Sequence, residues 1–130
     1  MSESVPHGLK YTKDHEWARE DGGEVVVGVT SFAVLQLGDI TLVNIDVKPG
    51  DVLEAGKAFG TIESVKTLSD LFAPIAGRVV KVNVDLESQP EIVNDDCYGK
   101  GWMIVLAGAA SGPELMDDKA YMDFLKAAAH

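Results

Sequence analysis

Glycine and proline interrupt this chain so often that long regular elements are excluded from most of it. The sequence holds 13 glycines and 5 prolines in 130 residues, and they separate short apolar runs. Valine-rich runs such as Glu24–Val29 and Gly77–Val84 are typical of strands. The pattern therefore predicts a mainly β domain in which short strands are joined by tight turns.

The expected strands follow from apolar alternation between these breaks. On one expected strand Val43, Ile45 and Val47 would share a face, and on another Val80, Val82 and Val84 would do so. The full set of expected strands is Glu24–Val29, Ile40–Val47, Val52–Leu53, Ala58–Ile62, Leu68–Phe72, Gly77–Val84 and Trp102–Leu106.

Three segments carry helical signals instead. Thr30–Gly38 has hydroxyl residues to cap its start and a glycine to end it. Glu87–Val93 is expected to form a short helix that Pro90 interrupts. An apolar stripe of Leu115, Tyr121, Phe124 and Leu125 predicts a helix over Pro113–Ala128. Residues 1–130 are thus expected to form one domain with a helical appendage at about 112–128.

Composition excludes several classes of function. The formal charge is −10, whereas nucleic acids and anionic membranes bind clustered cations, so neither is expected as a partner. The first residues contain no apolar or Arg-rich targeting segment, which favours the bacterial cytoplasm over a mitochondrial matrix. The single cysteine, Cys97, excludes an internal disulfide, and the three histidines lack the close spacing of zinc ligands, so no metal is expected.

Lys66 lies in the expected turn between Ala58–Ile62 and Leu68–Phe72, within the sequence Glu63-Ser64-Val65-Lys66. Further motifs follow one another along nearly the whole chain: Tyr11–Trp17, Gly28-Val29-Thr30, Leu37-Gly38-Asp39, Ser69-Asp70, Ala73-Pro74, Val93-Asn94-Asp95, Tyr98-Gly99 and Gly101-Trp102. With these motifs in this order, the chain resembles the H-protein family of the glycine cleavage system, whose members carry a lipoyl group.

The resemblance implies a fold and a cofactor. The fold would be a barrel-sandwich hybrid, in which two small antiparallel sheets face each other. A lipoyl- or biotinyl-like hairpin, a short helix near residue 32 and helices at the C-terminal end would complete it. Lipoic acid would be attached in amide linkage to Lys66.

The resemblance also implies a carrier role without catalysis. The arm on Lys66 would accept an aminomethyl group from a pyridoxal-phosphate-dependent glycine decarboxylase, the P protein. It would deliver this group to a tetrahydrofolate-dependent aminomethyltransferase, the T protein, and a dihydrolipoyl dehydrogenase, the L protein, would reoxidise it. A lipoylating enzyme would attach the arm. We expect a monomer, because one hairpin tip must enter several active sites in turn.

Two residues beside Lys66 are candidates for presenting it. Ser64 is small and polar, which leaves the amine accessible. Glu63 either takes part in recognition by the lipoylating enzyme, as the resemblance implies, or only keeps the turn soluble.

Four further residues are candidates for a cleft that shelters the loaded arm. Glu16 and Asp70, and more weakly Asp14, would contact the ammonium of the cargo. Trp17 would form an apolar wall. The alternatives are a solvated strand carboxylate for Glu16, a turn cap for Asp70 and core packing for Trp17. His15 is either a cleft residue or a core histidine.

Other functions stay open. A biotinyl carrier has the same hairpin but places methionines on both sides of the lysine, where this chain has Val65 and Thr67. Carrier domains of 2-oxo acid dehydrogenases lack the motif at Asp14–Trp17, the motifs between Val93 and Trp102 and the C-terminal helix. A relay that passes lipoate to other carriers would keep the fold. A small hydrolase using Asp14, His15 or Glu16 is the alternative from a different class.

Overall fold

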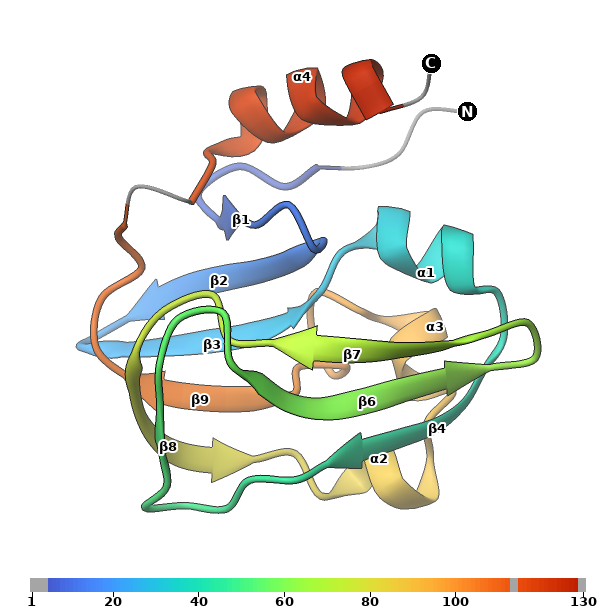
Figure 1. The fold of residues 1–130 in the computed structure, drawn as a ribbon, viewed down its shortest axis with the longest axis horizontal. Helices are drawn as coiled ribbons and strands as arrows, with labels where there is room; N and C mark the ends of the chain where they lie inside the picture. The colour runs from blue at the N-terminus through green and yellow to red at the C-terminus, as the bar shows by residue number, and fades with distance from the viewer. Residues whose placement is uncertain (1–4, 113–114, 129–130) are drawn as a thin grey trace.

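The computed structural model describes residues 5–112 and 115–128 of the chain (Figure 1). In chain order the elements are β1 (Lys10–Tyr11), β2 (Glu16–Asp21), β3 (Glu24–Val29), α1 (Ser31–Leu37), β4 (Ile40–Ile45), β5 (Val52–Leu53), β6 (Ala58–Ser64), β7 (Leu68–Phe72), β8 (Gly77–Val82), α2 (Asp85–Ser88), α3 (Ile92–Asp95), β9 (Ile104–Ala107) and α4 (Asp118–Ala128). No helix among these described residues is long and apolar enough to cross a membrane.

The strands form two antiparallel sheets, which confirms the predicted fold class. One sheet has the order β1-β2-β3-β9-β8-β5, and the other has the order β4-β6-β7. Figure 1 shows β6 and β7 of the smaller sheet in front of β3 and β9 of the larger sheet, so that the two sheets are stacked. Within the described strands both sheets are open at their edges, so the architecture is that of a sandwich rather than a closed barrel.

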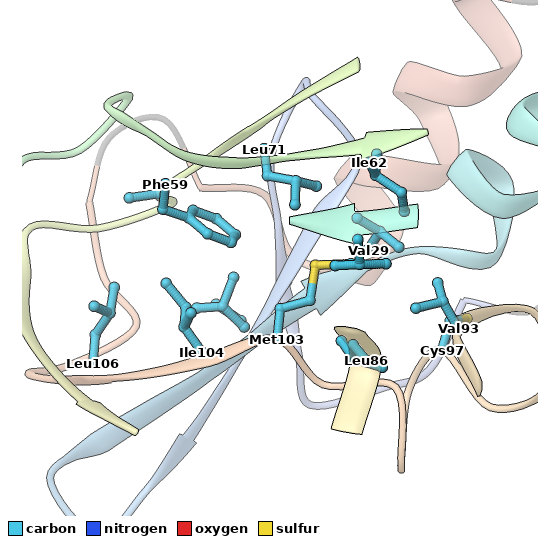
Figure 2. Close-up of a cluster of buried hydrophobic side chains, with 14 of the residues drawn as sticks. Val29, Phe59, Ile62, Leu71, Leu86, Val93, Cys97, Met103, Ile104 and Leu106 are labelled. Carbon is cyan, nitrogen blue, oxygen red and sulfur yellow. The ribbon is translucent and has the colours of Figure 1, made fainter. Parts of the chain in front are cut away.

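Apolar side chains from both sheets meet in the space between them (Figure 2). Phe59, Ile62 and Leu71 come from the smaller sheet, and Ile104 and Leu106 come from β9 of the larger one. Each of these side chains is at most 1% exposed. Burying one such side chain contributes roughly 1.5–3 kcal/mol to the stability of the fold. The packing of this apolar layer is therefore the main interaction that holds the two sheets together.

The helix α1 follows the prediction for its segment. The side chain of Thr30 caps it by accepting a hydrogen bond from the backbone N–H of Ala33 at 3.2 Å. Gly38 ends it with a φ of +82°. This positive φ is the reason that a glycine stands at the end of the helix.

The prediction for the strand at Gly77–Val84 is wrong in its faces and its end. β8 ends at Val82, and Val84 is 69% exposed, whereas Val79 is buried. The pairing of β8 with β9 shifts register between Val79 and Lys81. An irregularity of this kind changes which side chains point inward, and strict alternation along the sequence does not reveal it.

The two remaining helical segments differ from their predicted extents. Pro90 separates α2 from α3, so the interrupted helix at Glu87–Val93 is two short helices. The C-terminal helix α4 begins at Asp118, and Leu115 precedes it, whereas Pro113 lies outside the described residues.

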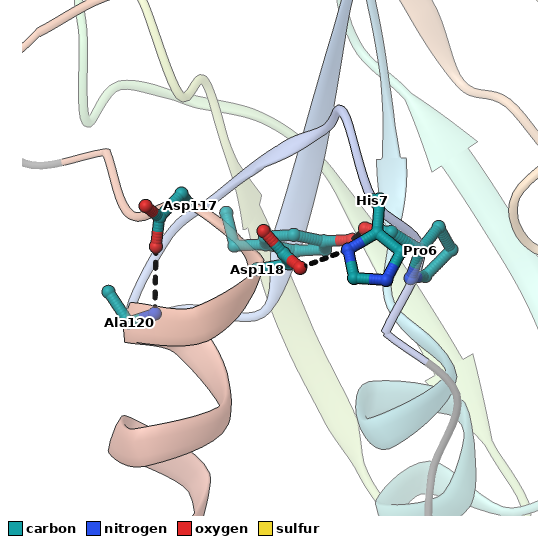
Figure 3. Close-up of polar contacts among 6 residues, drawn as sticks. Pro6, His7, Asp117, Asp118 and Ala120 are labelled. Carbon is teal, nitrogen blue, oxygen red and sulfur yellow. Dashed lines mark hydrogen bonds and ion pairs between the residues drawn. The ribbon is translucent and has the colours of Figure 1, made fainter.

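The start of α4 is joined to the N-terminal segment (Figure 3). Asp117 accepts a hydrogen bond from the backbone N–H of Ala120 at 2.8 Å, as a helix cap does. Asp118 pairs with the exposed side chain of His7. Deeper in the contact, the ring of Tyr121 stacks on that of Tyr11 with a centroid distance of 4.6 Å. The described N-terminal segment, including β1, therefore packs against α4.

Candidate functional site

Lys66 is exposed at the tip of the β6–β7 hairpin, as predicted from the sequence. The tip is held by Ser64, whose side chain is buried. The Ser64 Oγ accepts hydrogen bonds from the backbone N–H groups of Lys66 and Thr67, both at 3.2 Å. The backbone N–H of Ser64 also donates to the carbonyl of Thr67 at 2.8 Å. Ser64 thus fixes the turn that presents the lysine.

The tip is also tied to the link between α1 and β4. The N–H of Val65 donates to the carbonyl of Asp39 at 3.2 Å. The side chain of Asn94, on α3, accepts from the N–H of Ile40 at 2.9 Å and donates to the carbonyl of Gly38 at 3.0 Å. These hydrogen bonds join the tip of the hairpin, the residues between α1 and β4, and α3, and they fix the position of the turn that carries Lys66.

The stem of Lys66 runs close to Gly38. A Cβ added at Gly38 would lie 3.1 Å from Cε of Lys66 and 4.0 Å from its Nζ. The absence of a side chain at this position leaves the space that the lysine stem uses.

A cavity of about 170 Å³ lies beside the hairpin. Four parts of the chain form it: the residues at the start of β2, the end of β3, the helix α1, and the hairpin β6–β7. Its lining residues are Asp14, His15, Glu16, Val29, Ala33, Gln36, Leu37, Ile62, Thr67, Ser69, Asp70 and Leu71. The apolar ones among these are buried, whereas Asp14, Gln36, Thr67 and Asp70 are exposed. Such a lining suits a ligand with an apolar chain and a polar end.

Glu16 is the buried carboxyl of this cavity. It is 2% exposed, and it accepts hydrogen bonds from the Thr12 hydroxyl at 2.7 Å and from the Phe72 N–H at 3.2 Å. Burial raises its pKa to about 8, because the hydrogen bonds offset only part of the cost of removing the charge from water. A second cavity, of about 240 Å³, is lined by Glu16 and Asp14 as well. Glu16 is therefore a buried group between two cavities, and it is not a solvated strand carboxylate.

The predicted cleft residues separate into two groups. Glu16, Asp14 and Asp70 all line the cavity, although Asp70 is more than 50 residues away from the other two in the sequence. Trp17 does not line it: its ring is buried, and Nε1 donates to the carbonyl of Cys97 at 3.0 Å. In this structure Trp17 therefore packs in the core, which is the alternative that the sequence left open for it. Successive side chains of a strand point to opposite faces, so Trp17 turns away from the cavity that its neighbour Glu16 lines.

The two candidates beside Lys66 lie outside the cavity lining. Ser64 acts on the turn itself, as described above. Glu63 is exposed on the outer face of the smaller sheet, where it pairs in register with Leu42 on one side and Leu68 on the other. It therefore stands beside Lys66 on a surface that a macromolecule can reach.

His15 belongs to the cavity wall and is also hydrogen-bonded internally. Its Nδ1 lies 2.8 Å from the hydroxyl of Tyr121, and its ring packs against Phe32 with a centroid distance of 4.7 Å. Burial lowers the pKa of His15, so the neutral ring is favoured. The sequence left open whether His15 is a cleft residue or a core histidine. In the structure His15 lines the cavity and also makes an internal hydrogen bond, so it is both.

The contribution of α1 to the cavity was not predicted from the sequence. Ala33, Gln36 and Leu37 all face it. Residues three and four apart lie on one face of a helix, so this spacing was a usable signal once one of them had been assigned to the cavity. Nothing local in the sequence indicated that α1 would pack beside the hairpin.

Comparison with known proteins decides the family. The family model described as "Glycine cleavage H-protein" matches residues 9–128. The chain belongs to the glycine cleavage H-protein family. This membership confirms the resemblance found in the sequence, and it implies a lipoyl-carrier role in glycine cleavage rather than a catalytic one.

Individual members of the glycine cleavage H-protein family agree with this assignment over most of the chain. The glycine cleavage system H protein of Magnetococcus marinus is 52% identical over 122 residues, which cover 94% of this chain and 81% of that protein. The protein of the same name from Bacteroides thetaiotaomicron is 51% identical, with 91% of this chain and 94% of the relative covered. A crystal structure of a glycine cleavage system H protein from Mycobacterium marinum superposes with a TM-score of 0.85 at 37% identity, covering 94% of this chain and 99% of that one.

Proposed function

We propose that Lys66 carries a lipoyl group in amide linkage and that this chain is the lipoyl carrier of a glycine cleavage system. The observation that supports this best is the presentation of one exposed primary amine on a turn fixed by the buried Ser64. A modifying enzyme needs an accessible amine, and successive partners need it in a defined position. A hairpin tip held by hydrogen bonds meets both needs.

The residues around Lys66 fit such an arm. Gly38 leaves room for the lysine stem, and the neighbouring cavity offers buried apolar side chains together with exposed polar ones. When bound, the lipoyl group supplies a dithiolane that is reduced as it takes up a one-carbon amine and is later reoxidised. The role of this chain is to hold the arm and to exclude water from its end.

Three carboxyl groups are proposed to receive the amine of the cargo. Glu16 is the leading one, because a buried carboxylate pairs with a cation far more strongly than an exposed one does. Asp70 and Asp14 line the same cavity from its exposed side. Binding of a cationic amine would favour the ionised form of Glu16. Glu16 would therefore release its proton when the amine of the cargo enters the cavity.

The proposed partners follow from this role. They are the glycine decarboxylase (P protein), the aminomethyltransferase (T protein), the dihydrolipoyl dehydrogenase (L protein) and a lipoylating enzyme. Glu63 stands where that last enzyme must approach Lys66, and we assign recognition to it. We further infer that residues 1–130 act as one monomeric carrier domain with its helical appendage, in the bacterial cytoplasm.

Intact-mass measurement tests the attachment. The full chain is incubated with lipoate, ATP and a lipoylating enzyme, and peptides are then mapped. We expect a gain of one lipoyl group at Lys66, no gain for Lys66→Arg, and an unchanged gain for Lys57→Arg, which alters another exposed lysine on a turn.

The same experiment separates the alternatives. Incubation with biotin and a biotinylating enzyme should leave the mass unchanged, and a gain there would favour the biotinyl reading. No gain with lipoate, for a folded chain and an active enzyme, would refute the attachment. A glycine-cleavage assay with the three partner enzymes then distinguishes this carrier from a 2-oxo acid dehydrogenase domain or a lipoate relay.

A further inference from the structure

His15 has an unusual backbone conformation for a residue in a cavity wall. Its φ is +67°, and it is the one described residue other than glycine with a positive φ. Two backbone hydrogen bonds hold it: its N–H donates to the carbonyl of Thr12 at 3.1 Å, and its carbonyl accepts from the N–H of Thr30 at 2.9 Å. A conformation of this kind persists only where the surroundings maintain it.

A hydroxyl on the C-terminal helix supplies a further constraint. The Tyr121 hydroxyl lies 2.8 Å from Nδ1 of His15 and 2.8 Å from Oγ1 of Thr30. Thr30 in turn caps α1 through Ala33. Tyr121 is fully buried and does not line the cavity, yet its hydroxyl contacts both His15 and the cap of α1, and these two segments form much of the wall.

The hydrogens of this cluster can be assigned without conflict when His15 is neutral. Thr30 donates its hydroxyl hydrogen to Tyr121, and Tyr121 donates its own to Nδ1 of His15. Oγ1 of Thr30 keeps its role as acceptor for Ala33. In this assignment Nδ1 is an acceptor and the ring proton of His15 lies on Nε2. The reverse assignment, in which Nδ1–H donates to Tyr121 and Tyr121 donates to Oγ1 of Thr30, fits the same distances with the proton on Nδ1, so in either case the Tyr121 hydroxyl fixes one tautomer of His15.

We propose that Tyr121 is a positioning residue of the arm cavity, which makes the C-terminal helix α4 part of the functional site. From α4, its hydroxyl sets the orientation and tautomer of His15 and holds the start of α1 in place. The link to arm protection rests on the proposed lipoyl-carrier function, whereas the link to the state of His15 does not.

The chain offers a matched control for this hydroxyl. Tyr11 is buried like Tyr121, and the two rings are stacked with an interplanar angle of 6°. The hydroxyl of Tyr11, however, donates to the carbonyl of Pro6, and Tyr11 does not line the cavity. Tyr121→Phe and Tyr11→Phe therefore each remove one buried hydroxyl from the same stacked pair, and only the first touches the cavity wall.

The first readout uses the full chain without an arm. Nitrogen-15 NMR of the imidazole should show one predominant tautomer of His15 in the wild type and the same one in Tyr11→Phe. In Tyr121→Phe the preference for that tautomer should be lost. The second readout uses the lipoylated chain loaded by glycine decarboxylase: loss of cargo to water should be about fivefold faster in Tyr121→Phe than in Tyr11→Phe, the effect of one hydrogen bond. Lipoylation of Lys66 should be equal in both.

A second variant tests whether Tyr121 acts through His15. His15→Asn keeps a residue type that tolerates positive φ and removes the ring. It should accelerate cargo loss by itself, and Tyr121→Phe should add little in that background. If Tyr121→Phe does not fold, an unchanged cargo lifetime in His15→Asn overturns the proposal.

The outcomes are separable from those of the proposed function. Equal cargo lifetimes in Tyr121→Phe and Tyr11→Phe, or an unchanged tautomer of His15 in Tyr121→Phe, would overturn the positioning role. Failure to lipoylate Lys66 in every variant would instead refute the carrier function, and the NMR result on the chain without an arm would still decide what Tyr121 does to His15.

Discussion

Cε of Lys66 lies 3.1 Å from the position that a Cβ would occupy on Gly38. The two residues come from different elements: Gly38 ends α1, and Lys66 stands at the tip of the β6–β7 hairpin. Their proximity means that the helix terminus forms the surface along which the lysine stem lies.

Gly38→Ala should therefore affect both stability and modification. A residue with a side chain is strained at a φ of +82° and a ψ of −147°, at a cost on the order of 1–3 kcal/mol in the free energy of unfolding. The added methyl group would also displace the stem of Lys66 and slow lipoylation. Urea unfolding and the initial rate of mass gain measure the two effects.

Gly23→Ala is the control for Gly38→Ala. Gly23 has a φ of +85°, but a Cβ there would meet no atom within 4 Å. It should lose stability through the backbone and lipoylate at the normal rate. Normal lipoylation of Gly38→Ala would show that the contact with Lys66 has no influence on modification.

Ser64→Ala should loosen the hairpin tip. It removes the acceptor for the N–H groups of Lys66 and Thr67, and loss of such buried partners costs about 1–3 kcal/mol. We expect faster amide hydrogen exchange at Lys66 and Thr67 and a lower rate of lipoylation. Ser88→Ala, at an exposed serine of α2, should change neither quantity. Unchanged exchange at both amides would show that the turn does not depend on Ser64.

The raised pKa of Glu16 predicts a stability that falls as the pH rises. The folded protein keeps the proton up to a pH of about 8, whereas an unfolded carboxyl with its ordinary pKa of 4.5 has lost it. Between these values the folded state holds the extra proton, so the free energy of unfolding decreases with pH by at most about 1.4 kcal/mol per unit. Below this window both states are protonated, and above it neither is.

Glu16→Gln should remove that slope. The ionised carboxylate accepts from the Thr12 hydroxyl, whereas a glutamine, like the protonated acid, can instead donate to Oγ1 of Thr12 while its oxygen accepts from the N–H of Phe72. The lowered pKa of His15 adds an opposite slope below the ordinary histidine pKa of 6.5, so the comparison is made above it. Urea midpoints measured from about pH 7 to pH 8 should therefore fall for the wild type and for the exposed-site control Glu87→Gln, and stay nearly constant for Glu16→Gln. Parallel curves for all three chains would contradict the assignment of the slope to Glu16.

Glu16→Ala should shorten the lifetime of the cargo-loaded carrier without preventing lipoylation. The variant removes the buried carboxyl proposed to hold the amine, and a hydrogen bond between charged partners is worth about 1.5–3 kcal/mol, so cargo loss should be about tenfold faster or more. Release of ammonia from the isolated loaded chain measures it. Glu16→Gln distinguishes charge from packing, because it keeps the volume and removes the charge. An unchanged lifetime in Glu16→Ala would exclude this role.

Much of the fold is determined locally and was predicted from the sequence. α1 begins after Thr30 because that residue caps it, and it ends at Gly38 because glycine tolerates a positive φ. The strands on either side of Lys66 follow from alternating apolar residues. The motif around Lys66 predicted the hairpin tip for the same reason: a tight turn is decided by a few consecutive residues.

The tertiary structure alone decided what surrounds that tip. Glu16 and Trp17 are neighbours in sequence, and alternation predicts only that they point to opposite faces, not which face borders a cavity. His15 and Tyr121 are 106 residues apart, and their hydrogen bond exists because α4 packs over β1. Burial, and with it the pKa of a carboxyl such as Glu16, depends on which elements cover a residue, and these elements lie far away along the chain.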